Sequence, residues 1–284
     1  MSGLSTDLPA TDLPATDLPV VPRSGWTGTQ WAGAVILVLV LGFAILAPLL
    51  FPADPLRQSL RNILGPGDAA SPFGYDHLGR SLTARLAAAL RLSLLIAAAA
   101  VVTSALLGVA VGVLAAWRGG WVDRLFALLA DSFLALPGLL MVLIVSTIVP
   151  TTPLAFWLGL TLVLWIEYFR LTRATVSRLI AAPGVQASRL LGFGPVYIFR
   201  RHLWPELAPM LLTVAAFGAA TAIMMIAALG FVSVGMRPPT PELGLMMVEL
   251  LPYYREAPHA LLTPVIATFL TLLGLNLIAG GRRA

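Results

Sequence analysis

The sequence predicts an all-α polytopic membrane protein with about six transmembrane helices. Of its 284 residues, 58% are hydrophobic and only 11% are charged, and the apolar residues gather in long runs. A spanning helix needs about 20 mostly apolar residues. A soluble domain of this length would leave too much apolar surface facing water, so a membrane protein is the class that the composition favours.

The N-terminal residues 1–30 are predicted to be a disordered tail. Residues 6–20 repeat the pattern Thr-Asp-Leu-Pro three times, and a proline at every fifth position blocks a regular helix. The apolar run at 32–51 is too long for a signal peptide and lacks a convincing cleavage site. It is therefore expected to be the first span of one transmembrane domain, residues 31–284.

Five further spans are predicted, at residues 92–117, 125–149, 154–169, 207–234 and 260–279. Pro137 is expected to bend the third of them. Gly108 and Gly112 form a small-xxx-small face on the second, which predicts close packing against another helix.

The arginines predict the orientation in the membrane. All 18 basic residues are arginine, and six spans place both termini on one side. Segments on that side hold the arginines at positions 23, 118, 124, 170, 173, 178, 189, 200, 201, 282 and 283. The opposite side holds those at 57, 61, 80, 85, 91, 237 and 255. Because basic residues favour the cytoplasmic side, both termini are expected in the cytoplasm.

A polar segment at about 174–205 interrupts the apolar pattern between the fourth and fifth spans. It reads Gln186-Ala187-Ser188-Arg189-Leu190-Leu191-Gly192, and after nine residues His202-Leu203-Trp204-Pro205. Glycine accepts a positive φ at little cost, so Gly192 predicts a sharp turn between two short helices. Contact with a soluble partner is one interpretation. The other is that the arginines only anchor the segment to anionic headgroups, at about 1 kcal/mol each.

Missing residue types exclude several kinds of site. Without lysine the chain cannot form a G-x-x-x-x-G-K-[ST] phosphate loop, so any ATP-driven step must use another chain. Without cysteine it has no disulfide or thiolate metal site. His77, His202 and His259 are scattered without an i,i+4 pair, which makes a dedicated metal cage improbable. The basic balance fits membrane orientation better than nucleic-acid binding.

The polar segment resembles the "EAA" loop of ABC-importer permeases, whose pattern is Glu-Ala-Ala, three residues, Gly, nine residues, Ile-x-Leu-Pro. Gln186, Ala187, Ser188, Gly192 and Pro205 keep that spacing. Among the departures from the pattern, Gln186 replaces the glutamate, and Trp204 stands where the pattern has leucine. The resemblance implies that the charged contact of that glutamate becomes a neutral hydrogen bond here.

Other stretches resemble the dipeptide/oligopeptide/nickel subgroup of these permeases. Residues 74–80 are similar to its Gly-Thr-Asp-x-x-Gly-Arg-Asp segment. Further similar stretches follow in the same order: Gly119 to Arg124, Asp131 with Ala135-Leu136-Pro137, Tyr168 with Arg170 and Arg173, Phe231 to Gly235, and Pro238 to Pro241. The resemblance covers about residues 30 to 280 and is greatest to the C-type subunit.

That resemblance implies a MetI-like fold and half of a translocation pathway in the bacterial cytoplasmic (inner) membrane. It implies four partners: a second permease in a heterodimer, two cytoplasmic ATPases and an extracytoplasmic substrate-binding protein. ATP and Mg²⁺ would be bound by the ATPases, so this chain would hold no cofactor and catalyse no reaction. Its cargo would be di- or oligopeptides, nickel or metal chelates. Arg189, Arg200 and Arg201 would pair with ATPase carboxylates, while Leu190, Leu191 and Phe193 would fill an apolar groove.

Asp131 and Glu167 fall inside or at the ends of predicted spans, where a charge must face a cavity, a partner or the interface. They are candidates for the pathway or the bundle interior. For Glu167, an i,i+3 ion pair with Arg170 is the simpler expectation.

Two other functions remain open from the residues alone. A membrane-embedded enzyme needs a nucleophile with a base, or metal ligands at helical spacing. The sequence has no H-E-x-x-H motif, and Ser233 misses the G-x-S-x-G spacing by one residue. A proton-coupled secondary transporter needs paired ionisable residues near the midplane, which two isolated carboxylates do not supply.

Overall fold

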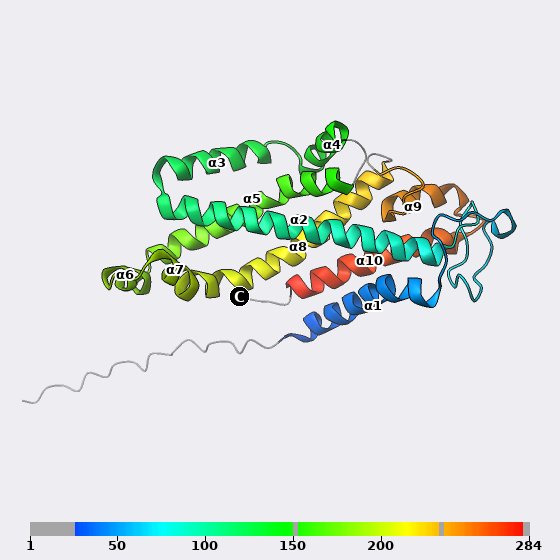
Figure 1. Cartoon of the computed structure of the whole chain (residues 1–284), viewed down its shortest axis with the longest axis horizontal. Helices are drawn as coiled ribbons and strands as arrows, with labels where there is room; N and C mark the ends of the chain where they lie inside the picture. The colour runs from blue at the N-terminus through cyan, green and yellow to red at the C-terminus, as the bar shows by residue number, and fades with distance from the viewer. Residues whose placement is uncertain (1–25, 150–152, 233–235, 281–284) are drawn as a thin grey trace, which may run out of the picture.

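The computed structural model describes residues 26–149, 153–232 and 236–280. In these residues the chain forms a bundle of long helices (Figure 1). The repeats at 6–20, residues 150–152 between the third and fourth predicted spans, Ser233 and the last arginines lie outside the described residues.

Helix α2 (Leu82–Arg118) is the centre of the bundle and packs along α5 (Pro153–Ile180). The predicted face of small residues is confirmed at this contact. A Cβ atom added to Gly108 would lie 2.5 Å from the Cβ of Tyr168, and one added to Gly112 would lie 2.9 Å from the Cβ of Thr172. Only glycine allows the two backbones to approach this closely.

Three more helices complete the main body. α1 (Gly28–Leu50) pairs with α10 (Pro258–Gly280), and α8 (Trp204–Phe231) packs between α10 and α2. The main core lies where α2, α5 and α8 meet and includes Ala97, Ala100, Leu160, Ile223 and Ile226, each at most 1% exposed. α1 begins at Gly28 with a capping box between Thr27 and Gln30, so the helix enters the last residues assigned to the tail.

The third predicted span is broken at the expected place. α3 (Gly120–Leu134) and α4 (Gly138–Ile148) meet at 87° around Pro137. Proline removes a helical hydrogen bond and clashes with the preceding turn. The described residues therefore hold five helices able to cross a membrane, or six if this broken pair counts as one.

Two helices extend beyond their predicted ends. The predictions stopped short because charged residues interrupt the apolar runs there. α2 starts at Leu82, where Arg85 and Arg91 interrupt the apolar run. α5 continues to Ile180 through Arg170, Arg173 and Arg178, so residues 174–180 of the predicted polar segment are helical. With 37 residues, α2 is about 55 Å long, well beyond the ~30 Å hydrocarbon layer.

The bundle has two distinct ends (Figure 1). The loop end carries residues 51–81 with the turn η1 (Leu60–Asn62), the short helix α9 (Leu243–Leu250) and the turn η3 (Leu251–Tyr253). The insert end carries α6 (Pro183–Leu190), α7 (Pro195–Ile198) and the turn η2 (Phe199–Leu203). α9 was not predicted from the sequence.

Candidate functional site

The polar segment folds as two short helices joined by a glycine elbow, and we call residues 181–203 the insert. Each helix begins with a proline, Pro183 or Pro195, where the missing N–H has no helical partner to lose. Between them Gly192 has a φ of +82°, which glycine adopts at little cost. The turn predicted at Gly192 is confirmed.

The insert continues into α8 without a break. Phe199–Leu203 form one π-helical turn, in which the N–H of Trp204 donates to the carbonyl of Phe199. Pro205 follows in the first turn of α8 and has no N–H to donate. Because the helical run is continuous from Pro195 to Phe231, a displacement of the insert acts directly on α8.

Gln186 attaches α6 to the end of α5. Its exposed side chain donates from Nε2 to the carbonyl oxygen of Ile180 at 2.8 Å. That carbonyl belongs to the last turn of α5, whose carbonyls lack partners within the helix. A carboxylate only accepts hydrogen bonds, so the glutamate of the family pattern could not make this contact.

Ser188 joins the two halves of the insert. Its buried hydroxyl donates to the carbonyl of Gly184 at 3.0 Å, and its Oγ lies 2.9 Å from Nε2 of His202. Since the hydroxyl proton is used on Gly184, the Nε2–H of His202 is the donor in the second bond. The serine in place of the pattern's second alanine thus connects α6 to the π-helical turn.

The arginines of the insert have different surroundings. The Arg189 guanidinium lies over the ring of Trp117 at the end of α2, 4.7 Å from its centroid. Such cation–π contacts contribute about 0.5–1 kcal/mol at exposed sites. Arg200 and Arg201 are exposed on the π-helical turn, and Ala187 is exposed on α6. Arg189 thus braces the insert, whereas the other two arginines face solvent.

The tip of the insert exposes large apolar side chains, and we call Leu190, Leu191, Phe193 and Val196 the apolar tip. Leu190 is 89% exposed, Leu191 76% and Val196 71%. The Phe193 ring stacks on Tyr197 with centroids 4.3 Å apart. Exposed large apolar side chains gathered within a few residues at a polar end of a protein are typical of an interaction site.

Asp131 and Glu167, the two candidates for pathway or interior positions, are both exposed on the described chain. Asp131 on α3 forms an ion pair with Arg170 on α5 at 2.9 Å, and Asp123 pairs with Arg173 in the same way. These pairs attach α3 to α5. The expected i,i+3 pair between Glu167 and Arg170 is wrong, because Arg170 reaches across to the neighbouring helix instead.

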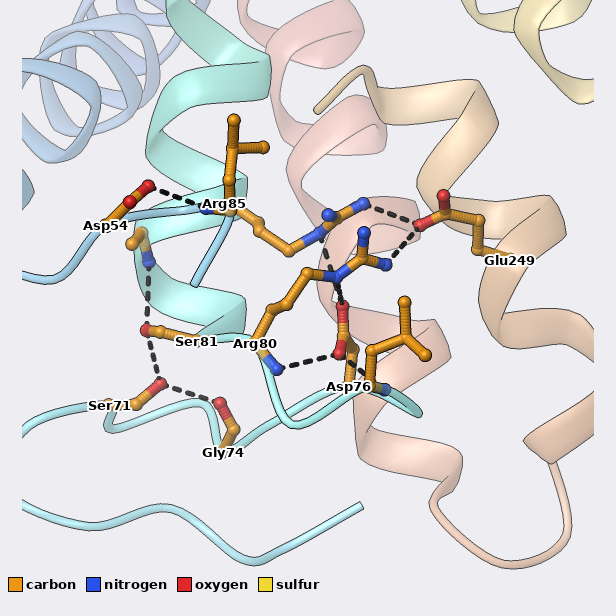
Figure 2. Close-up of polar contacts among 11 residues, drawn as sticks. Asp54, Ser71, Gly74, Asp76, Arg80, Ser81, Arg85 and Glu249 are labelled. Carbon is orange, nitrogen blue, oxygen red and sulfur yellow. Dashed lines mark hydrogen bonds and ion pairs between the residues drawn. The ribbon is translucent and has the colours of Figure 1, made fainter. Parts of the chain in front are cut away.

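Sequence reasoning missed a second polar site, a cluster of four charged residues at the loop end. This ion cluster consists of Asp76, Arg80, Arg85 and Glu249, and Figure 2 shows both guanidinium groups between the two carboxylates. Arg80 Nε lies 2.6 Å from Asp76 Oδ2, and the Nη2 atoms of Arg80 and Arg85 lie 3.0 and 2.6 Å from Glu249 Oε2. From the sequence alone, Arg80 and Arg85 are expected only to be orientation charges on the outer side.

The residues around the ion cluster are also ordered by polar contacts. The Ser81 hydroxyl donates to Ser71, whose hydroxyl donates to the carbonyl of Gly74 at 2.6 Å (Figure 2). The His77 ring stacks on Tyr253 with centroids 5.2 Å apart. Burial lowers the pKa of His77, with Asp76 and Glu249 acting against that shift.

Glu242 holds the start of α9. Its carboxylate accepts hydrogen bonds from the backbone N–H groups of Gly244 and Leu245 at 2.9 and 2.8 Å. Burial raises the pKa of Glu242, and these backbone hydrogen bonds oppose the rise. A carboxylate at a helix N-terminus compensates N–H groups that lack a helical partner.

The histidines do not come together. His77 lies at the loop end, His202 in the insert, and His259 at the start of α10. In the described part of the chain, no group of three or more His, Asp or Glu residues is arranged to hold a metal ion.

Comparison with known proteins decides the family. Residues 108–281 match the family described as binding-protein-dependent transport system inner membrane component. The chain belongs to this family. The match begins at Gly108 in α2, includes all of α5 and the whole insert, and fits the bundle of membrane-spanning helices.

Three relatives of this binding-protein-dependent transport component cover nearly the whole chain. The di/tripeptide transport system permease protein DppC of Pseudomonas aeruginosa is 34% identical over 88% of this chain and 85% of its own length. The dipeptide transport system permease protein DppC of Escherichia coli is 36% identical over 88% and 86%. The nickel transport system permease protein NikC of Escherichia coli is 30% identical over 90% and 93%.

The family confirms the expected fold and function at the level of a multi-pass permease subunit of an inner-membrane transport system. A membrane-embedded enzyme and a proton-coupled secondary transporter are not favoured.

Proposed function

We propose that this chain is a non-catalytic permease subunit of an ATP-driven importer and that the insert couples it to a cytoplasmic ATPase. It would pair with a second permease, each forming half of the translocation pathway. Two ATPase chains would bind ATP and Mg²⁺, and an extracytoplasmic binding protein would deliver the cargo. The lack of lysine, and so of a phosphate loop, assigns nucleotide binding to other chains.

The apolar tip is the observation that carries this proposal. Leu190 and Leu191 are among the most exposed large apolar residues of the chain, although they lie on an insert braced by Gln186, Ser188 and Arg189. Covering one leucine side chain contributes about 1.5–3 kcal/mol. An apolar projection on a braced insert that also carries Arg189, Arg200 and Arg201 is suited to a cleft with an apolar floor and acidic rim.

The arrangement of charges supports an insert end in the cytoplasm. Arg118 and Arg124 lie near the insert end of α2 and α3, together with the arginines of the insert and of the second half of α5. α1 starts and α10 ends on the same side of the bundle (Figure 1). Because basic residues favour the cytoplasmic face, we infer that both termini are cytoplasmic.

ATP binding would act by shifting a two-state equilibrium of the permease pair. Nucleotide-driven approach of the two ATPases would bring the two inserts together. The continuous helix from Pro195 to Phe231 would then tilt α8 and change the access of the pathway from inward to outward.

We propose short peptides as the cargo. The relatives named for dipeptide or di/tripeptide transport are 29% to 36% identical to this chain, those of Pseudomonas aeruginosa and Escherichia coli reaching 34% and 36%, and the one named for nickel is 30% identical. These cargoes are distinguished by uptake into proteoliposomes that contain the complete complex. The substrates compared are a labelled dipeptide and nickel or a nickel chelate. Uptake of nickel alone would contradict the peptide assignment.

The coupling role is tested by charging the apolar tip. Replacing Leu190 and Leu191 with Asp should reduce co-purification of the ATPases and lower ATP-dependent uptake at least tenfold, because a carboxylate cannot be buried in an apolar groove without a partner. Leu60→Asp is the matched control, since Leu60 is 88% exposed at the loop end. It should leave both properties unchanged.

Uptake that persists in the Leu190→Asp, Leu191→Asp variant would contradict the coupling role of the insert. Labelling of a cysteine placed at Gly192 from the extracytoplasmic side of intact cells would contradict the proposed orientation.

A further inference from the structure

We propose that the ion cluster is a permanent clamp that makes α9, the 51–81 loop and the first turns of α2 move as one rigid body during transport. This inference rests on the proposed function, because the transport cycle supplies the movement. Arg80 and Arg85 precede Glu249 by 169 and 164 residues, so the clamp joins segments that the chain order does not hold together.

Asp76 is the fixed half of the clamp. Its Oδ1 accepts the backbone N–H groups of Leu78 and Arg80, each at 2.9 Å, while its Oδ2 accepts Nε of Arg80 (Figure 2). Nε of Arg85 lies 3.4 Å from the same oxygen. Asp76 therefore orients both arginines from within their own segment, whatever α9 does.

Glu249 is the half contributed by α9. A single oxygen, Oε2, accepts from both guanidinium groups. The side chains of Asp76, Arg80 and Arg85 are at most 2% exposed and that of Glu249 is 13% exposed. The cluster is neutral as a whole, with two positive and two negative groups away from water.

Neutrality and burial together make the clamp difficult to open. If α9 withdrew Glu249, two buried guanidinium groups would share one carboxylate, and an uncompensated buried charge is strongly unfavourable. Nη1 of Arg85 already has no hydrogen-bond partner among the described residues. Arg85 would then lose its closest acceptor as well. We therefore expect the cluster to stay closed in every state of the cycle.

The clamp completes a connection between the two ends of the molecule. The insert is continuous with α8, and α9 packs against α8 and α10. Glu242 fixes the start of α9, and stacking of Tyr253 on His77 fixes the turn after it. A tilt of α8 is thereby passed through α9 and Glu249 to the loop at the opposite end, where a binding protein would dock.

The first experiment closes the contact covalently. His77→Cys and Tyr253→Cys replace the stacked pair with two thiols, and the chain has no other cysteine. A short bifunctional methanethiosulfonate, which bonds each thiol through a reducible disulfide, should link them in the complete complex, and peptide uptake should stay within about twofold of the unlinked variant. Loss of uptake on linking that returns on reduction would overturn the clamp, because it would show that α9 must separate from the loop.

The second experiment is a charge cycle that does not depend on the cysteine variant. Glu249→Gln leaves the cluster with an excess positive charge and Arg85→Gln with an excess negative one, whereas the double variant leaves a neutral Asp76–Arg80 pair. Each single variant should lower binding-protein-stimulated uptake at least tenfold and speed amide hydrogen exchange in α9. The double variant should recover most of both.

Glu256→Gln is the matched control, because Glu256 is an exposed carboxylate at the same end and its neutralisation should change neither readout. Wild-type behaviour of Glu249→Gln, or a double variant as impaired as the two singles combined, would overturn the clamp. A wild-type complex that shows no ATP-dependent uptake would contradict the proposed function, while hydrogen exchange in α9 would still test the clamp.

Discussion

Gln186 shows how one side chain adapts a shared structural element. The Nε2–H of Gln186 caps the carbonyl of Ile180, and Ser188 bonds His202 across the insert. Both positions differ from the Glu-Ala-Ala pattern. In each case the replacement adds a hydrogen bond within the insert. The insert is therefore braced by its own side chains before any partner binds.

Restoring the glutamate should loosen this brace. Gln186→Glu removes a hydrogen bond worth about 1 kcal/mol and places a negative charge beside the C-terminus of α5, at a cost of about 0.3–1 kcal/mol. Faster amide hydrogen exchange across residues 181–192 is the expected result. Gln58→Glu, an exposed glutamine at the loop end, is the control. Unchanged exchange in Gln186→Glu would contradict the capping role.

His77 gives the loop end a dependence on pH. Burial holds its pKa below the ordinary value of 6.5, so the unfolded chain binds a proton more readily than the folded one. Stability should therefore be full above pH 6.5 and fall as the pH drops below it towards the lowered pKa. Thermal unfolding of the purified complex between pH 7.5 and 5.5 measures this. His77→Phe keeps the stacking on Tyr253 and should flatten the acid side of the profile; an unchanged profile would contradict the assignment.

At the scale of elements, the contact between α2 and α5 depends on two glycines. Gly108→Leu would place a Cβ 2.6 Å from the carbonyl oxygen of Trp165 and push the helices apart. Overpacking of a tight contact costs about 1–3 kcal/mol, so a lower unfolding temperature and poor assembly are expected. Gly42→Leu on α1, where no atom lies within 4 Å of the added Cβ, should be tolerated. Equal stability of the two variants would contradict this packing.

The spans were predictable because apolar runs of about 20 residues have few alternatives to crossing a membrane. The ends of the spans were not predictable, because the sequence does not show which carboxylate will neutralise an arginine. Arg85 is neutralised by Glu249, and Arg170 by Asp131. α9 was missed for a related reason: it is too short to span, and only its buried contacts with α8 and α10 define it.

At the scale of the whole molecule, the insert could be predicted from the sequence, whereas the ion cluster could not. The insert is local in sequence, so the spacing of Gly192 and Pro205 predicted its position. The ion cluster is assembled from segments more than 160 residues apart. In the sequence, the Gly74 to Arg80 stretch shows a resemblance to a family segment but no sign of its contact with Glu249. A lone glutamate in the otherwise apolar Leu243–Leu250 helix was the signal that could have pointed to it.

The corner between α3 and α4 limits how this subunit can be surrounded in a membrane. Around Pro137 the chain turns by 87°, and Leu134 and Leu136 there are half exposed. Hydrocarbon offers no hydrogen bonds, so irregular backbone at membrane depth persists only under protein or beside water. We therefore expect a neighbouring protein chain or water, and not acyl chains, to cover that corner. An isolated copy of this subunit should be unstable in a lipid membrane.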